Sequence, residues 1–78
     1  MPRYFFDIHD GDDVVLDDTG SDLDDLDAAK GQVMSILPQV ALEMLPDRRH
    51  REMQAVLRDE AGSALFKATL TFRCASLR

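Results

Sequence analysis

The sequence predicts a two-layer α+β domain with the element order β-β-α-β-β, on three observations. Apolar and polar residues alternate in segments near both ends of the chain, as they do in strands with one buried face. An apolar repeat with three- and four-residue spacing occupies the middle, as in a helix that buries one stripe. The chain has 78 residues, enough for one hydrophobic core and too few for two. We therefore expect a single domain over residues 1–78.

The first hairpin is predicted over residues 3–16. Alternation places Tyr4, Phe6 and Ile8 on one face of a strand and Phe5, Asp7 and His9 on the other. The turn is predicted at Asp10-Gly11, because glycine accepts a positive φ and aspartate bonds its own backbone. The apolar residues 14–16 then form a short return strand.

The apolar repeat predicts one long helix that follows a polar connection. Its buried stripe comprises Leu26, Ala29, Val33, Ile36, Leu37, Val40, Ala41, Met44 and Leu45. Asp24 or Asp25 is suited to cap its N-terminus, and Pro46-Asp47 is expected to end it. The arginines Arg48, Arg49 and Arg51 then lie near its negative end.

Two residues inside this predicted helix disfavour it. Gly31 destabilises a helix interior by about 1 kcal/mol relative to alanine. Pro38 lacks a backbone N–H, so it is expected to kink or split the helix near Leu37.

A second hairpin is predicted over residues 53–73, with its turn at residues 60–63. Its first strand turns Met53, Ala55 and Leu57 inward, and its second turns Phe66, Ala68, Leu70 and Phe72 inward. The first and last strands of the four are the most apolar, so we place them at the centre of the sheet. The expected strand order is 2-1-4-3, with the helix across one face.

The opposite face of the sheet is the candidate interaction surface. It is expected to carry Phe5, Asp7, His9, Val56, Leu65, Lys67, Thr69 and Thr71. Because this mixed surface is half-apolar, a monomer would leave apolar side chains in water. Contact with a second copy, through this face or through an exposed edge strand, would cover them.

The charge distribution limits the classes of partner. Net charge is −6, but residues 1–27 hold ten Asp against one Arg, whereas residues 28–78 hold eight Lys or Arg against five Asp or Glu. An acidic surface is repelled by phosphate backbones, so nucleic-acid binding is not expected. No stretch approaches the roughly 20 apolar residues of a membrane helix. With Cys74 as its only cysteine, the chain is expected to be cytoplasmic.

Candidate chemical sites are few. The cluster Asp10, Asp12, Asp13, Asp17 and Asp18 lacks the spacing of a calcium loop. Asp7 and His9 share a strand face, so the aspartate could orient the imidazole as a general base, but nothing supplies a nucleophile beside them. We therefore expect no catalytic residues, no metal site and no cofactor.

Four short motifs stand out along the chain: an Arg-Tyr-Phe-Phe start at residues 3–6, an Asp-Gly turn at residues 10–11, a link resembling Asp-x-x-Gly that ends in Asp18-Thr19-Gly20, and Arg-Asp-Glu-x-Gly at residues 58–62. In these motifs the sequence resembles a family of small bacterial proteins of unknown function. The resemblance implies the boundaries of the fold and no activity.

These features favour a non-enzymatic interaction module that acts as a homodimer. One alternative is an acidic regulator, similar to an antitoxin or a nucleic-acid mimic, that binds a basic protein partner. Another is a small ligand binder or enzyme that uses Asp7 and His9.

Overall fold

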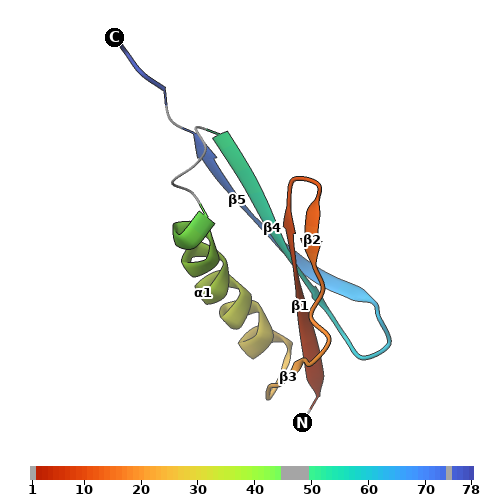
Figure 1. The fold of residues 1–78 in the computed structure, drawn as a ribbon. Helices are drawn as coiled ribbons and strands as arrows, with labels where there is room; N and C mark the ends of the chain where they lie inside the picture. Colours follow the sequence, from red (N-terminus) through yellow and green to blue (C-terminus); the bar gives the residue numbers. More distant parts are fainter. Residues whose placement is uncertain (1, 45–49, 74) are drawn as a thin grey trace.

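The computed structural model describes residues 2–44, 50–73 and 75–78 and has one helix packed on one face of an antiparallel sheet (Figure 1). Its elements are β1 (Arg3–Asp10), β2 (Asp13–Val15), β3 (Ser21–Asp22), α1 (Leu26–Met44), β4 (His50–Arg58) and β5 (Ala64–Arg73). The α+β class is therefore confirmed, with β3 as an additional short strand. The expected helix end at Pro46-Asp47, the side chains of Arg48, Arg49 and Arg51, and Cys74 lie outside the described residues.

The strand order differs from the prediction. The sheet runs β2-β1-β4-β5, so β4 lies beside β1, and β5 is at the edge instead of the centre. Every pairing is antiparallel; Phe6 is opposite Leu57, which is opposite Phe66. The prediction took overall apolar content as the sign of a central strand.

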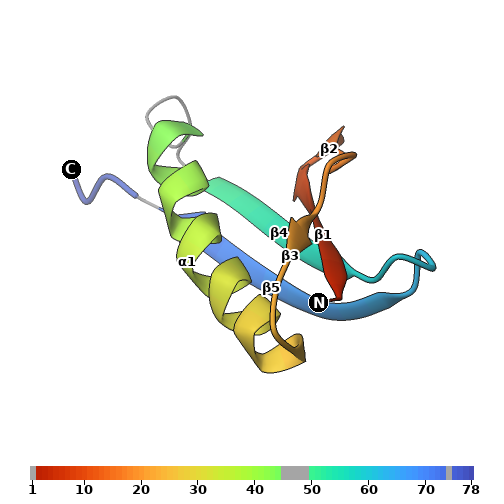
Figure 2. The same ribbon diagram turned by 90° about the horizontal axis from the view of Figure 1, so that it is seen from below.

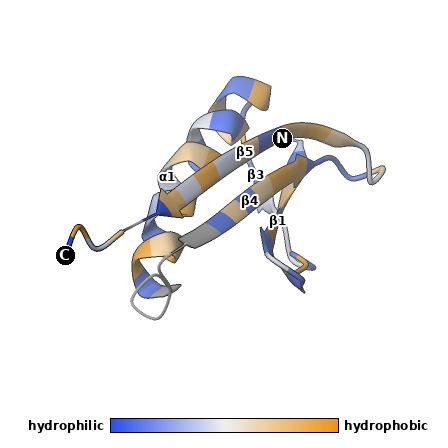
Figure 3. Cartoon of the chain, turned by 90° about the horizontal axis from the view of Figure 1, so that it is seen from above, coloured by the Kyte–Doolittle hydropathy of each residue, from blue (hydrophilic) through white to orange (hydrophobic). Residues whose placement is uncertain are grey.

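Burial shows why β4 is central. Its inward residues Met53, Ala55 and Leu57 are fully buried, whereas Phe66 and Leu70 of β5 are only partly buried. The helix α1 contacts both strands, and Figure 2 shows it crossing that face of the sheet. A central strand is therefore specified by complete burial of a few side chains, and β5 keeps a polar outer face. Residue hydropathy changes from position to position along both strands in Figure 3.

The helix is continuous from Leu26 to Met44, so the expected split at Pro38 does not occur. Ala29, Val33, Leu37 and Ala41 form its buried stripe, as the spacing predicted. Pro38 is exposed, and the residue four positions earlier, Met34, is exposed too, so water can solvate the carbonyl that proline leaves without a partner. No helix in the described part of the chain is both long and apolar enough to cross a membrane.

Of the two residues predicted to cap the N-terminus of the helix, Asp25 does so. The Asp25 carboxylate accepts a hydrogen bond of 2.8 Å from the backbone N–H of Ala28, three residues on. This is the geometry of an N-cap, which satisfies an amide that has no partner within the helix.

We predict that Gly31→Ala stabilises the protein by about 0.5–1 kcal/mol, because alanine loses less backbone entropy on folding than glycine does in a helix. Gly31 is exposed, and a Cβ there would meet no atom within 4 Å. Urea unfolding monitored by circular dichroism measures the change.

Gly62→Ala is the matched control for this prediction. A Cβ on Gly62 also has open space around it, but its φ is +88°, which disfavours any L side chain. We expect Gly62→Ala to lower the unfolding free energy. If Gly31→Ala and Gly62→Ala changed the unfolding free energy equally, this explanation from backbone conformation would be wrong.

Candidate functional site

The most unusual side chain in the structure is a carboxylate buried on the face of the sheet away from α1. Asp7 of β1 is 5% exposed. Its Oδ1 accepts the backbone N–H of Asp17 at 2.9 Å, and its Oδ2 accepts Nε of Arg58 at 2.7 Å. Both carboxylate oxygens are therefore engaged, as a buried charge requires.

Arg58 lies at the end of β4 and joins three groups. Besides its bond to Asp7, its Nη2 donates to the backbone carbonyl of Asp17 at 2.7 Å. Its guanidinium lies over the ring of Phe5, 4.6 Å from the ring centroid, a cation–π contact. The side-chain hydrogen bond to Asp7 raises the pKa of Arg58, so this group stays charged. We call Asp7, Asp17 and Arg58 the ionic cluster.

Asp17 completes an interrupted sheet edge. β1 pairs with β2 from Ile8 onward and with β3 at Tyr4, and the backbone N–H of Phe6 falls in the gap between them. Asp17 Oδ2 accepts that N–H at 3.1 Å, so a side chain replaces a missing strand carbonyl. Its Oδ1 accepts the N–H groups of Thr19 and Gly20 at 3.1 and 3.0 Å.

The charge state of Asp17 reflects this setting. Burial raises the pKa of its carboxyl, but the hydrogen bonds from Gly20, Phe6 and Thr19 and the charge of Arg58 together lower it below the ordinary value of 3.8. The carboxylate is therefore preferentially stabilised in the folded state.

The segment 16–20, which we call the arch, lies across the outer face of β1. Gly20 has a φ of +77°, and a Cβ there would meet Phe5 Cε2 at 2.8 Å and Arg3 Cγ at 2.9 Å. Only glycine allows this approach without displacing the side chains beneath. Arg3 also donates to the carbonyl of Thr19 at 2.7 Å and pairs with Asp22. The arch thus covers the β1 part of the face.

The candidate interaction surface is therefore smaller than expected. Asp7 is buried and Phe5 partly covered, because the arch and Arg58 lie over them. His9 and Val56 are half-buried, and Leu65, Lys67, Thr69 and Thr71 are exposed. The part of this face that remains open belongs to β4 and β5.

The proposed Asp7–His9 pair does not form. Asp7 is bound to Arg58 and to the arch, and His9 instead lines a polar hollow of about 200 Å³ with Gly11, Glu52 and Gln54. Asp7 is therefore not available to orient the imidazole of His9. The two residues share a face, as predicted, without sharing a function.

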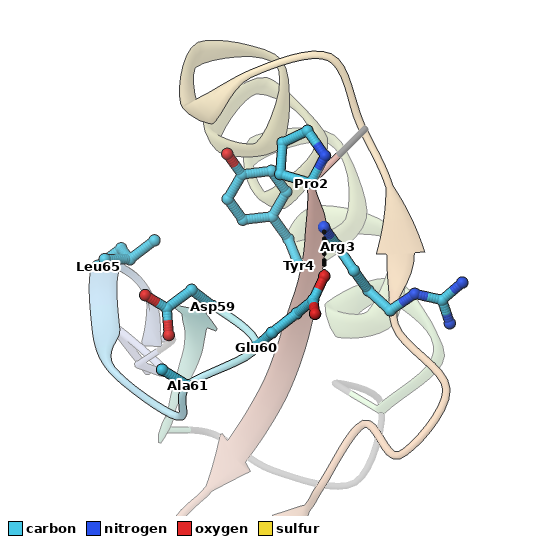
Figure 4. Close-up of a pocket in the computed structure, with 7 residues that line it drawn as sticks. All are labelled: Pro2, Arg3, Tyr4, Asp59, Glu60, Ala61 and Leu65. Atoms are coloured by element: carbon cyan, nitrogen blue, oxygen red, sulfur yellow. Dashed lines mark hydrogen bonds between the residues drawn. The ribbon is translucent and has the colours of Figure 1, made fainter.

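A second hollow, of about 340 Å³, was not predicted. It lies where β1 continues past the end of β4, beside the turn between β4 and β5 (Figure 4). Tyr4 and Leu65 lie on either side of it with Asp59 between them, and the Arg3 guanidinium points away. Its lining residues are Pro2, Arg3, Tyr4, Asp59, Glu60, Ala61 and Leu65.

The Arg-Asp-Glu-x-Gly motif builds the wall of this hollow. Asp59 Oδ1 accepts the backbone N–H of Ser63 at 2.9 Å and closes the turn. Glu60 Oε1 accepts the backbone N–H of Arg3 at 3.2 Å and ties the turn to the start of β1. The motif was a sequence signal for this site, but a single sequence could not show that residues 2–4 and 59–61 meet.

The aspartate cluster does not assemble. Among the described residues there is no group of three or more His, Cys, Asp or Glu side chains placed to hold a metal ion. Asp17 already binds three backbone N–H groups, and Asp13 lies exposed in β2.

We predict that Asp17→Asn lowers the unfolding free energy by about 1–3 kcal/mol, because an amide presents one acceptor oxygen where the carboxylate presents two, and the arch loses a charged acceptor. The lowered pKa of Asp17 means that its contribution is complete above the ordinary pKa of 3.8 and is lost as the pH falls through the lower folded pKa. As the pH falls from 5 through the folded-state pKa of Asp17, the unfolding free energy of the wild-type protein should therefore decrease more than that of the variant. Urea unfolding across this range measures the difference. Asp18→Asn, on the exposed side of the arch, is the control and should change little.

We also predict that Arg58→Met destabilises the protein more than the double substitution Asp7→Val with Arg58→Met does. The single change leaves a buried carboxylate with no counter-charge, whereas the double change removes both charges. A double-mutant cycle by chemical denaturation tests this. If the effects of Asp7→Val and Arg58→Met on the unfolding free energy simply added, Asp7 and Arg58 would not be energetically coupled.

Comparison with known proteins identifies a family. A search of curated proteins and a search of solved structures gave no match. The model of one protein family, described as "Domain of unknown function (DUF6894)", matches residues 3–71. The matched region runs from the start of β1 to within two residues of the end of β5 and includes the ionic cluster and every lining residue of the second hollow except Pro2. The chain therefore belongs to the DUF6894 family of domains of unknown function.

Proposed function

We propose that this protein is a non-enzymatic protein-interaction module that acts as a homodimer through the outer edge of β5. The observation that carries the proposal is that β5 is ten residues long, lies at the edge of the sheet, and pairs on that side with no strand in the described part of the chain. An unpaired strand edge is a template for another strand.

The opposite edge of the sheet differs in a way that supports this choice. β2 has three residues and β3 has two, and the arch interrupts them. Asp17 satisfies the backbone amide in the gap, so this edge is short and closed. Natural proteins protect edges by such interruptions. The pairing of β5 with β4 is irregular only at its start, where the register shifts between Ala64 and Phe66.

The helix leaves the β5 edge accessible. Although α1 contacts both strands, the inward residues of β4 are fully buried while Phe66, Ala68 and Leu70 of β5 are only partly buried. Phe72, near the end of β5, is 36% exposed although it was expected in the core. A second copy paired at this edge would extend the inward face and cover it.

Side-chain chemistry favours one register for an antiparallel pair of β5 strands. Centring the twofold axis on Thr69 places Phe66 opposite Phe72 of the second copy on the inward face, and Lys67 opposite Thr71 on the outward face. Centring on Lys67 would oppose two lysines, and centring on Leu70 would oppose Lys67 and Arg73. Aromatic cross-strand pairs stabilise a sheet and like charges destabilise it, so the Thr69 register is preferred.

The shape of the chain is in keeping with a subunit of a larger assembly. Its Cα radius of gyration is 14.0 Å, whereas a domain of this length is expected at about 11.5 Å. Within the described residues only Tyr4, Val33, Leu37, Met53 and Leu57 are buried apolar side chains larger than alanine. Burial of Phe66 and Phe72 against a second copy would enlarge this small core.

The acidic-regulator alternative ranks second. The exposed residues Asp12 and Asp13 support it, because they could attract a basic partner. Against it, four aspartates of the first 27 residues have structural partners: Asp7 and Asp17 in the ionic cluster, Asp22 with Arg3, and Asp25 at the helix start. Part of the negative charge is thus explained by the fold itself. The single cysteine suits a reducing, cytoplasmic setting.

We predict that Thr69→Cys, in a Cys74→Ser background, forms a disulfide-linked dimer on mild oxidation. The two Thr69 residues are directly opposite in the proposed register, within the Cα separation that a disulfide spans. Thr71→Cys in the same background is the control, because its opposite residue is Lys67, and it should cross-link much less. Non-reducing electrophoresis at several protein concentrations measures both.

Analytical ultracentrifugation tests the dimer independently. Phe72→Lys should weaken association, because it places a cation opposite Phe66, whereas Val14→Lys, on the exposed residue Val14 of the opposite edge, should not. A wild-type chain that stays monomeric to high micromolar concentration would refute the homodimer.

A further inference from the structure

We propose that the segment Ala75–Arg78 of one chain occupies the second hollow, beside Tyr4 and Leu65, of a second copy. This inference rests on the β5-to-β5 homodimer proposed above. It assigns an occupant to a hollow that otherwise has no role.

The chemistry of the hollow selects an apolar group next to a cation. Pro2, Tyr4 and Leu65 supply apolar surface, and Asp59 and Glu60 add carboxylates at its rim (Figure 4). The hydrogen bonds to Ser63 and Arg3 each use one oxygen of these carboxylates and hold them in place. A leucine followed by an arginine matches this surface.

The chain itself carries such a pair in its last described segment. Leu77 is 96% exposed, and Arg78 next to it is exposed as well. Figure 1 shows this segment extending beyond the end of β5 and away from the helix and sheet. An apolar side chain of this size held wholly in water gains free energy by burial.

The segment cannot reach the hollow of its own chain. Leu65, which lines the hollow, is near the beginning of β5, and the segment follows its other end at Arg73. A strand of this length spans roughly 30 Å. Residues 75–78 extend away from β5 at the end remote from the hollow.

An antiparallel second copy removes this separation. In the register centred on Thr69, Arg73 of one copy is opposite Leu65 of the other. Residues 75–78 of the first copy then extend past Leu65 toward the turn between β4 and β5 of the second copy, which holds Glu60 and Ala61. Both Ala61 and Glu60 line the hollow. The register was chosen from residues 66–73, and it brings the segment to the end of the sheet where the hollow lies. By symmetry, both hollows of the dimer are filled.

A charge exchange tests the contact between Arg78 and Glu60. Glu60→Lys and Arg78→Glu should each raise the dimer Kd in ultracentrifugation by roughly threefold to tenfold, as expected when a partly exposed ion pair becomes a like-charge pair. The chain with both substitutions again presents opposite charges and should recover the wild-type Kd to within about twofold. Failure of the double variant to recover would overturn the inference.

Variants in the segment alone keep this test decisive if Glu60→Lys disturbs the fold. Leu77→Ser alters a side chain that is 96% exposed in the single chain, so it should leave the unfolding free energy unchanged and still weaken the dimer. An unchanged Kd for Leu77→Ser would also overturn the inference.

Cross-linking between different chains locates the contact. With Cys74→Ser in all chains, Ala61→Cys mixed with Leu77→Cys should form a mixed disulfide, whereas Ala61→Cys mixed with Leu42→Cys, an exposed helix position, should not. If the Thr69→Cys cross-link forms but this one does not, the dimer stands and the occupant of the hollow is wrong. If neither forms and the chain is monomeric, both proposals fail.

Discussion

The ion pair between Asp7 and Arg58 is the interaction on which the arrangement of this small domain depends. A carboxylate that is 5% exposed needs partners for both oxygens. One partner is Arg58, which requires the end of β4 to lie next to β1. The other is the backbone of Asp17, which requires the arch to fold back over the face of the sheet. A single buried charge thus links the strand order to the path of the connection that precedes the helix.

This cluster also makes the two edges of the sheet unlike each other. At the β1 edge, Asp17 supplies the acceptor that an interrupted strand cannot, and the arch covers the neighbouring side chains. At the other edge, β5 is long and regular, apart from a register shift at its first residues. The association through β5 that we propose would use the open edge and leave the closed one intact.

The sequence motifs of this chain acquire a physical meaning from these contacts. Residues 3–7, the arch, and residues 58–62 are distant in sequence and meet at one end of the sheet. Within them, Asp7 and Arg58 form the ion pair, Gly20 allows close approach of the arch, and Glu60 ties the turn to β1. These residues hold the fold together and, at the same time, shape the hollow beside Tyr4.

The sequence by itself determined the local elements, because turns, caps and apolar periodicity depend on neighbouring residues. It predicted the helix stripe through Ala29 and Ala41, the cap at Asp24 or Asp25, and the inward residues of β4. Only the tertiary structure decided the strand order, the continuity of the helix through Pro38, and the burial of Asp7. The strand order depends on which side chains become fully enclosed, and Pro38 is tolerated because it faces water. Asp7 was assigned to an open surface because its partners, Asp17 and Arg58, are 10 and 51 residues away along the chain. Contacts at such separations arise from packing, and the alternation of apolar and polar residues along one strand cannot predict them.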